Sequence, residues 1–281
     1  MAGLTRVRLL ILVVLYRRAL RRSQTLGSLA ACRADLEDSL LVVWDNGPER
    51  AAEEEGQWLH RAFPRVAYLH DAANPGLATV YNRTIAHYLK PAMPEPFDYM
   101  VLFDHDSKID PAFFAELARA RRAHPEIPLF LPLVTAQGRI VSPANFYVFK
   151  GFYWKKKRTG LSRTRYRTAI NSGMVISVPY LRDEFLGYDE RLRSYGTDNF
   201  FMREYNKNHG QFVILDCAIE HDLACFTPEP VETKLRRHHE NMNSVRLLNE
   251  EGSLRAWIAQ FYCGVHSLRQ AIRYRDLRFL A

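Results

Sequence analysis

Short apolar segments alternate with segments of helical character through the first hundred residues, and this alternation limits the folds available to the chain. The apolar segments are Leu9–Leu15, Leu40–Trp44, Val66–His70 and Met100–Phe103. Short segments rich in Leu, Val and Ile are typical of strands in a parallel sheet that is covered on both faces. Because a helical segment separates each pair, the order predicts a parallel, doubly wound α/β sheet.

The second half of the chain is more mixed and ends in a helical region. Further strands are predicted within Ile127–Val134, Met174–Val178 and Phe212–Ile219, and the tripeptide Pro228-Glu-Pro230 then interrupts the pattern. We expect a main domain over residues 1–230 and a C-terminal helical extension over residues 231–281. Apolar residues recur there with a helical period: Leu254, Trp257, Ile258, Phe261, Tyr262, Val265, Leu268 and Ile272.

The composition predicts a folded protein with anionic partners. Of 281 residues, 47% are hydrophobic, which is enough for a sizeable core. The net charge of +8 favours nucleotide phosphates, anionic lipid headgroups or nucleic acid, and does not choose among them. The four cysteines form no C-x-x-C pair, so neither a zinc site nor a disulfide framework is indicated, and a reducing compartment is expected. No secretory signal peptide is recognised, and no apolar segment is long enough to span a bilayer as a helix.

Two aspartates with one residue between them follow the strand Met100–Phe103. Asp104 and Asp106 therefore lie at the carboxyl end of a predicted strand, where open α/β sheets bind their ligands. Two neighbouring carboxylates repel each other unless a cation accompanies them. Mg²⁺ and Mn²⁺ prefer oxygen ligands and often bridge protein carboxylates to substrate phosphates. The pair therefore predicts a divalent metal and a phosphorylated substrate.

Several motifs occur in an order that resembles glycosyltransferase family 2, whose nucleotide-binding fold is called GT-A. The resemblance covers roughly residues 9–222, and it implies a mostly parallel, Rossmann-like central sheet flanked by helices. The motifs are Val42-Val-Trp-Asp45-Asn-Gly47, Asn74-Pro-Gly76-Leu-Ala78-x-x-x-Asn82, Phe103-Asp-His-Asp106, Asn171-Ser-Gly-Met-Val-Ile-Ser177, and Gly187-Tyr-Asp-Glu190 followed by Tyr195-Gly-Thr-Asp198-Asn-Phe.

The resemblance implies an inverting transfer of a sugar from a nucleoside-diphosphate sugar to a hydroxyl group. The expected donor is a UDP- or dTDP-sugar, and the expected acceptor is a glycan or a lipid-linked glycan. Asp106 would hold Mg²⁺ or Mn²⁺, and Asp104 would share the metal or contact the ribose. On the nucleotide side the resemblance implies Tyr16, Asp45, Asn74 and Asn82.

Asp198 is the candidate general base, because inverting transfer requires the acceptor hydroxyl to lose its proton during the attack. It precedes a predicted helix, so capping that helix is the alternative role. The family's usual Glu-Asp pair is Thr197-Asp198 here, and its usual serine after Asn-Gly is Pro48, so Asp189 and Glu190 stay open as alternative bases.

His221, at the end of the last predicted strand, is a further candidate ligand of the metal, the alternative being a structural histidine. The segment Lys150–Arg167 carries eight Lys and Arg residues and no Asp or Glu. It is either a lid over the diphosphate, which would keep out water, or a solvated loop.

The C-terminal extension combines an apolar stripe with many arginines, which suits anionic lipid. We therefore expect a cytoplasmic enzyme, peripheral at the inner face of the cell membrane and active in bacterial surface polysaccharide synthesis. No nucleic-acid substrate is expected.

Two other functions fit parts of the sequence. Phe103-Asp-His-Asp-Ser also resembles the nucleophile loop of haloacid-dehalogenase-type phosphatases, in which Asp104 would form a phospho-enzyme. That loop normally follows the first strand of its domain, whereas this one follows the fourth. A nucleic-acid-binding protein would use the basic, aromatic segment, but no nucleic-acid fold signature accompanies it and the carboxylates would have no role. A nucleotidyltransferase would carry a glycine-rich loop after the first strand, and none follows Tyr16.

Overall fold

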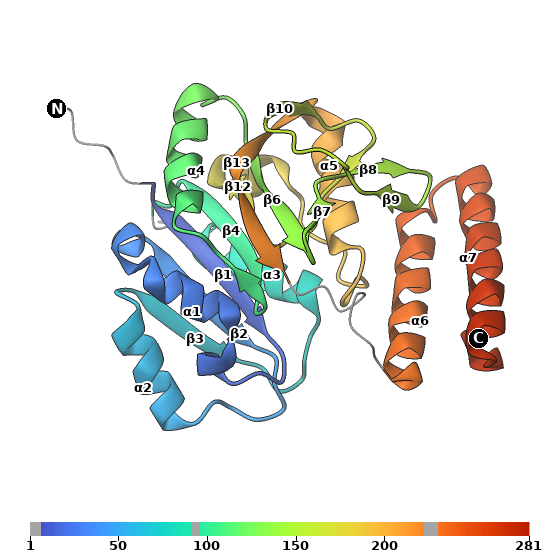
Figure 1. The fold of residues 1–281 in the computed structure, drawn as a ribbon, viewed down its shortest axis with the longest axis horizontal. Helices are drawn as coiled ribbons and strands as arrows, with labels where there is room; N and C mark the ends of the chain where they lie inside the picture. Colours follow the sequence, from blue (N-terminus) through green and yellow to red (C-terminus); the bar gives the residue numbers. More distant parts are fainter. Residues whose placement is uncertain (1–6, 91–95, 222–229, 281) are drawn as a thin grey trace.

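The computed structural model describes residues 7–90, 96–221 and 230–280, which form a central sheet between two layers of helices, with two further helices at the C-terminus (Figure 1). The central sheet has the strand order β10-β13-β6-β12-β4-β1-β2-β3, with β5 paired to β13 and β7 paired to β6. Its strands are β1 (Leu9–Leu15), β2 (Leu40–Asp45), β3 (Val66–His70), β4 (Tyr99–Asp104), β5 (Ser107–Lys108), β6 (Leu129–Ala136), β7 (Arg139–Ser142), β10 (Gly160–Arg163), β12 (Met174–Ser177) and β13 (Gln211–His221).

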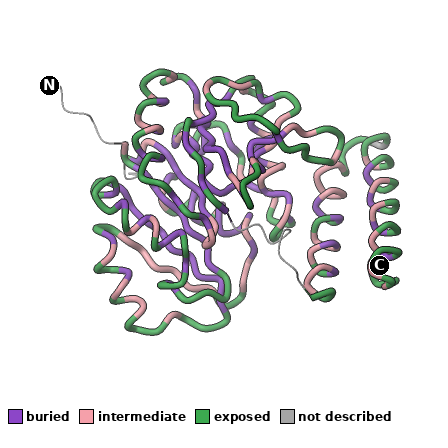
Figure 2. The backbone as a smooth tube through the Cα atoms, in the orientation of Figure 1, coloured by how far each residue is buried: buried purple, intermediate pink, exposed green. Residues whose placement is uncertain are grey.

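Two cores lie on opposite faces of the sheet because successive side chains of a strand point to opposite sides. In β1, Leu10, Leu12 and Val14 face one core, whereas the alternate residues face the other. Helices α3 (Leu77–Tyr88) and α5 (Thr197–Asn208) cover the first face. Helices α1 (Gln24–Ala31), α2 (Glu53–Ala62) and α4 (Ala112–Ala123) cover the second. Figure 2 shows the buried strands as the central band of the molecule.

The predicted α/β class is confirmed, but the sheet is parallel only in part. Strands β3, β2, β1 and β4 are parallel neighbours, and β6 is parallel to β13. Strand β12 is antiparallel to both β4 and β6, so it interrupts the parallel pairing at that point of a sheet predicted to be mostly parallel. The reason is that the chain turns back after β6 through β7 and returns to the gap between β4 and β6 without a crossover helix.

The basic segment predicted as a lid or loop contains short strands. A separate three-stranded sheet has the order β11-β8-β9, with β8 (Ala144–Tyr147), β9 (Lys150–Phe152) and β11 (Arg167–Thr168). Strand β10, from the same segment, forms the edge of the central sheet against β13. The segment is therefore bound at both ends to ordered structure.

The C-terminal region forms a helical hairpin of α6 (Val231–Leu248) and α7 (Ser253–Tyr274), which packs beside α5 (Figure 1). The proposed domain boundary adjoins residues 222–229, which lie outside the described part, as does Cys225. Cys32, Cys217 and Cys263 are buried free thiols. Within the described residues, no helix is both long and apolar enough to cross a membrane. Short helical turns complete the described chain at Leu20–Arg22, Arg33–Leu36, Tyr180–Glu184 and Leu277–Leu280.

Candidate active site

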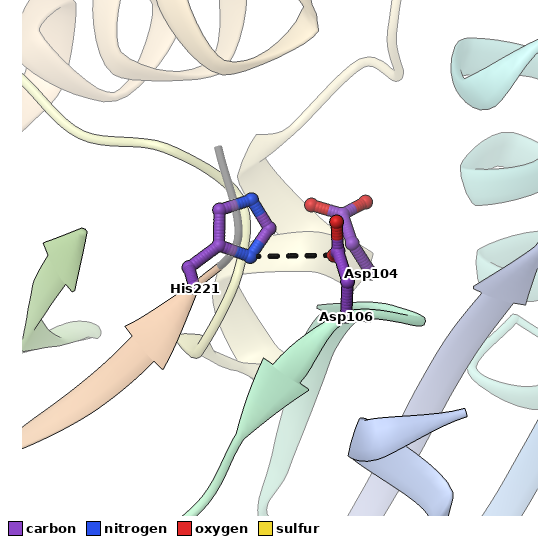
Figure 3. Close-up of side chains that lie close together, drawn as sticks. All are labelled: Asp104, Asp106 and His221. Carbon is purple, nitrogen blue, oxygen red and sulfur yellow. Dashed lines mark ion pairs between the residues drawn. The ribbon is translucent and has the colours of Figure 1, made fainter. Parts of the chain in front are cut away.

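Three potential metal ligands meet at one edge of the central sheet. Asp104 ends β4, Asp106 precedes β5, and His221 ends β13, which pairs with β5 so that His221 is opposite Ser107. Figure 3 shows the two carboxylates side by side, facing the imidazole ring. One ligand atom from each residue lies within 4.8 Å of the others, and His221 Nδ1 is 3.4 Å from Asp106 Oδ1. The group predicted from the sequence is therefore assembled by strand pairing.

Hydroxyl groups from distant segments fix the orientation of these ligands. Ser172 Oγ donates to Asp104 Oδ2 at 2.6 Å, and Ser107 Oγ lies 3.1 Å from His221 Nδ1. Thr25, in α1, donates from its hydroxyl to the Asp104 carbonyl and accepts from the Ser107 amide at 2.9 Å. No pattern in the sequence marks these three hydroxyls as part of the site.

The electrostatics of the group fit a divalent cation. Burial raises the pKa of Asp106, the nearby His221 opposes that rise, and the Asp104 carboxylate adds to it. Asp106 Oδ1 is a buried acceptor without a hydrogen-bond donor. A carboxylate oxygen in that position needs a positive charge or a proton. Two carboxylates and one imidazole form a donor set that suits Mn²⁺ and, through its oxygens, Mg²⁺.

Asp198 lies in the first turn of α5, behind Gly196, which adopts a left-handed conformation with φ of +86°. The side chain is half-buried, and its Oδ1 accepts a hydrogen bond from the Asn199 amide at 2.7 Å. Burial raises the pKa of Asp198 to about 6, against the effect of that hydrogen bond, and the charge of Asp104 adds to the rise. A carboxylate with a pKa near neutrality is suited to accept a proton.

The segment before β12 connects the metal ligands to the helix that carries Asp198. Asn171 Nδ2 donates to Thr197 Oγ1 at 2.9 Å, and the next residue, Ser172, holds Asp104. Gly173 then has φ of +81° and lies so close to β6 and β13 that a Cβ would be 2.6 Å from Pro132 Cγ. The motif that begins at Asn171 thus positions both parts of the site.

Of the residues predicted to contact the nucleotide, Asp45 and Tyr16 lie at or just beyond strand ends, and they differ in burial. Asp45 ends β2 beside the end of β1, at the same sheet edge as Asp104. It is buried, and its carboxylate accepts hydrogen bonds from the Tyr68 hydroxyl at 2.7 Å and the Gly47 amide at 2.8 Å. Tyr16, one residue beyond β1, is exposed, with the Arg17 guanidinium 5.2 Å from its ring.

The two asparagines have structural partners in the described chain. Asn74 has φ of +47°, and its carbonyl accepts from Arg193. Asn82 lies in α3 and uses its side chain on the segment that follows Gly187. It accepts from the Tyr188 amide at 2.8 Å and donates to Glu190 Oε1 at 3.1 Å. Their role in nucleotide binding stays a prediction.

The two alternative bases are also engaged. Asp189 forms an ion pair with Arg191 at 2.7 Å, which holds the pKa of Asp189 below its ordinary value. Glu190 Oε2 accepts from Thr79 Oγ1 at 3.0 Å. The pKa of Asp189 is lowered whereas that of Asp198 is raised, which makes Asp198 a better candidate base than Asp189.

The C-terminal hairpin touches the start of α5. A Cβ on Gly196 would lie 2.8 Å from Ser244 Cβ of α6, so only a glycine fits between the two helices there. Arg237 of α6 donates to the Tyr195 hydroxyl at 2.6 Å, and Arg203 of α5 donates to the carbonyl of Leu248.

The sheet order, with an acidic pair at the end of its fourth strand, is that of the GT-A fold. Searches of protein-family models and of curated protein sequences find no match to this chain. Solved structures with the same fold include S. aureus TarS residues 1–349, at a TM-score of 0.56 and 14% identity over 90% of this chain and 68% of that one. This TarS fragment has been solved in complex with UDP and with UDP-GlcNAc.

Two further structures carry the same likeness. GalNAc-T7, solved with UDP, GalNAc and Mn²⁺, has a TM-score of 0.63 at 14% identity, over 96% of this chain and 53% of that one. The mannosyltransferase PcManGT from Pyrobaculum calidifontis, solved with GDP-Man and Mn²⁺, has a TM-score of 0.57 at 12% identity, over 88% of this chain and 66% of that one. At such identities the likeness establishes the fold, which is the one that the sequence motifs predicted.

Proposed function

We propose that this protein is an inverting glycosyltransferase that moves a sugar from a nucleoside-diphosphate sugar to a hydroxyl of a glycan or lipid-linked glycan. The observation that carries the proposal is the meeting of Asp104, Asp106 and His221 at the sheet edge, beside a half-buried Asp198 with a raised pKa. The GT-A neighbours solved with UDP-GlcNAc or GDP-Man support a nucleotide-sugar donor. A UDP- or dTDP-sugar is the proposed donor.

Asp104, Asp106 and His221 would hold Mg²⁺ or Mn²⁺ in this mechanism. When bound, the cation neutralises charge on the departing nucleoside diphosphate. Ser172 and Ser107 keep the ligands in place through their hydrogen bonds. The buried Oδ1 of Asp106, which accepts no hydrogen bond and lies 3.4 Å from His221 Nδ1, supports a bound cation there.

Asp198 would accept the proton of the acceptor hydroxyl. A carboxylate whose pKa is near 6 is ionised at neutral pH and is a stronger base than an exposed aspartate. The hydrogen bond between Asn171 and Thr197 holds the first turn of α5, which carries Asp198, beside the segment that contacts Asp104. Asp45 and Tyr16, at the ends of β2 and β1, are proposed to contact the base of the nucleotide, with Asn74 and Asn82 completing that side.

A donor screen tests this function. UDP or dTDP release from a nucleotide sugar that needs Mn²⁺ or Mg²⁺ and an acceptor supports the transferase, and the anomeric configuration of the product, read by NMR, tests inversion. Phosphate release from small phosphomonoesters, abolished by Asp104→Asn, would instead support the phosphatase.

We also propose that the protein acts at the cytoplasmic face of the membrane in surface polysaccharide synthesis. The support is helix α7, which exposes an apolar stripe of seven side chains: Leu254, Trp257, Ile258, Phe261, Val265, Leu268 and Ile272. No Asp or Glu occurs within Ser253–Tyr274, whereas Arg255, Arg269 and Arg273 do. A helix with an exposed apolar stripe and basic flanks suits an anionic lipid surface.

A further inference from the structure

The small sheet β11-β8-β9 carries three exposed aromatic rings that form one surface. Tyr147, Phe152 and Tyr166 are 46%, 47% and 54% exposed. The ring of Tyr147 lies 5.9 Å from that of Phe152 and 5.6 Å from that of Tyr166, centroid to centroid. We call these three rings the aromatic platform. Large aromatic rings left open to solvent on an ordered sheet are a common feature of binding surfaces.

Cations surround the platform. Lys150 Nζ lies 5.6 Å from the ring centre of Phe152, and Arg165 Cζ lies 4.9 Å from that of Tyr166. Arg167 Cζ lies 5.8 Å from the ring centre of Trp154. In the small sheet, Arg167 of β11 and Phe152 of β9 both pair with Asn145 of β8, from its two sides. Such contacts hold the cations above the rings without neutralising them.

Acidic residues are missing from the sequence around these cations. Residues 127–182 contain ten Lys and Arg residues and no Asp or Glu. Lys157 pairs with Asp216 from β13 at 2.5 Å. For Lys150, Arg165 and Arg167 no ion pair occurs with any residue that the structure describes. The surface therefore has a net positive charge that favours an anionic ligand.

The small sheet that carries the platform is joined to α5, the helix of the candidate base. Thr168, at the end of β11, donates from its hydroxyl to Asn199 Oδ1 at 2.7 Å, and the Asn199 amide donates to Asp198. From Arg167 the chain reaches Ser172, which holds Asp104, in five residues, or at most about 17 Å when extended. The sheet that carries the platform is thus fixed to the first turn of α5, in which Asp198 lies.

We propose that the aromatic platform and its cations bind the acceptor, and that the acceptor is an oligosaccharide with an anionic group such as a carboxylate. A sugar ring presents C–H groups on its faces, which stack on aromatic side chains, and an anionic substituent at its edge would meet Lys150 or Arg165. The proposal rests on the proposed glycosyl transfer. Single-stranded nucleic acid also stacks on basic, aromatic surfaces, but an acceptor is the ligand that the proposed transfer requires, and the sheet that carries the platform is joined to the helix of Asp198.

Calorimetry with matched oligosaccharides tests the platform. The probes are a hyaluronan tetrasaccharide, which carries carboxylates, and chitotetraose, which is neutral. We expect the wild-type protein to bind the acidic probe about tenfold more tightly at low salt, and less so at high salt. Tyr147→Ala with Tyr166→Ala should weaken both complexes, whereas Lys150→Gln with Arg165→Gln should remove only the preference for the acidic probe.

Exposed residues on α7 provide the control: Trp257→Ala and Arg273→Gln should leave both affinities unchanged. Equal binding of the two probes, no binding of either, or platform variants that bind as the wild type does would overturn the proposal. So would a single-stranded oligonucleotide that binds the platform more tightly than the acidic probe.

UDP binding with Mn²⁺ is measured on the same samples. Platform variants that keep it while losing the oligosaccharide support the acceptor role. A wild-type protein that binds no nucleoside diphosphate would instead refute the proposed function itself, whatever the platform binds.

Discussion

A single half-buried carboxylate sets the pH range in which transfer is expected. The pKa of Asp198 is raised to about 6, and the residue must be ionised to accept a proton. We therefore expect kcat/KM to fall as the pH decreases through about 6, and not near 4 as for an ordinary aspartate. Asp198→Asn should lower kcat by about 10²–10⁴-fold while UDP binding changes little. Near-normal turnover in that variant would move the base to another residue.

Asp106 is expected to contribute to the affinity for the metal rather than directly to the proton transfer. Its Oδ1 accepts no hydrogen bond, so Asp106→Ala removes a candidate ligand and, among the contacts of that atom, the ion pair with His221. Mn²⁺ affinity, measured by titration with electron paramagnetic resonance, should fall at least about tenfold. The exposed Asp183 provides the control, because Asp183→Asn removes the same charge far from the site. Equal Mn²⁺ affinity in both variants would contradict the assignment.

Two glycines with similar positive φ angles allow the cost of steric overlap to be distinguished from the cost of the left-handed backbone conformation. Gly173 has φ of +81°, and a Cβ there would lie 2.5 Å from Ile219 Cδ1. Gly138 has φ of +73° and no atom within 4 Å of the Cβ position. Gly138→Ala should cost about 1 kcal/mol from the left-handed conformation alone, and Gly173→Ala about 1–3 kcal/mol more. Urea unfolding of both variants measures the difference, and equal losses would show that the site tolerates the methyl group.

At the scale of residues, the positions of strand ends in the sequence predict the candidate metal ligands, but not the hydroxyl groups that hydrogen-bond to them. Asp104 and His221 could be placed together because each ends a predicted strand of one sheet. Thr25 and Ser172 could not, because their contacts join segments 79 and 68 residues apart and their local sequence carries no distinctive pattern. Asn82 was assigned to the nucleotide from its motif alone, whereas the structure gives its side chain a partner in Tyr188.

At the scale of elements, α6 and α7 enclose a histidine that resists protonation. Burial lowers the pKa of His238 from 6.5 to about 4, and the neighbouring rings of His266 and His239 add to the effect. His238 Nε2 lies 2.9 Å from Ser267 Oγ on the facing helix. The unfolded chain takes up a proton near pH 6.5 and the folded chain only near 4. Between these values the unfolded state binds more protons, so stability falls as the pH decreases.

The melting temperature at pH 7 and pH 5 measures this effect. The wild-type protein should lose more stability between the two values than His238→Gln, which cannot be protonated. If both lose the same amount, His238 does not contribute to the pH dependence.

Elements with strong local patterns were predictable, and those without were not. The strand Leu9–Leu15 is β1 with the same bounds, because seven consecutive apolar residues admit no other assignment between polar ends. The strands β8, β9 and β11 have two to four residues each, too few to show a period of two. Strand β9 begins the basic segment, β8 precedes it and β11 begins at its last residue. Strands β8 and β9 form a short hairpin in which Tyr147 pairs with Lys150, and β11 pairs with β8 across the whole basic segment. No local pattern in the sequence indicates either pairing, so the sequence predicts a lid or a loop. The antiparallel orientation of β12 was not predictable for a similar reason, because it depends on pairing with β4 and β6, which lie far earlier in the chain.

At the scale of the whole molecule, α7 offers a surface that can be altered without disturbing the core. The rings of Trp257 and Phe261 stack 5.8 Å apart, and both are exposed. Trp257→Ser with Phe261→Ser should reduce co-sedimentation with phosphatidylglycerol vesicles by about tenfold or more. Leu186→Ser is the control, because that leucine is 99% exposed on the main domain. A double variant that sediments as the wild type does would argue against a membrane role for α7.

The glycine at the start of α5 has a consequence for how the chain can be divided. Gly196, two residues before Asp198, lies against Ser244 of α6. The C-terminal extension therefore packs directly against the start of α5, the helix that carries the candidate base. The domain division near residue 230 stays a prediction, and the contacts between α6 and α5 cross it. A version trimmed there would expose the face of α5 that α6 covers and free the turn carrying the base. Loss of activity on trimming would thus reflect a displaced carboxylate as readily as a lost membrane contact, and point changes on α7 separate the two.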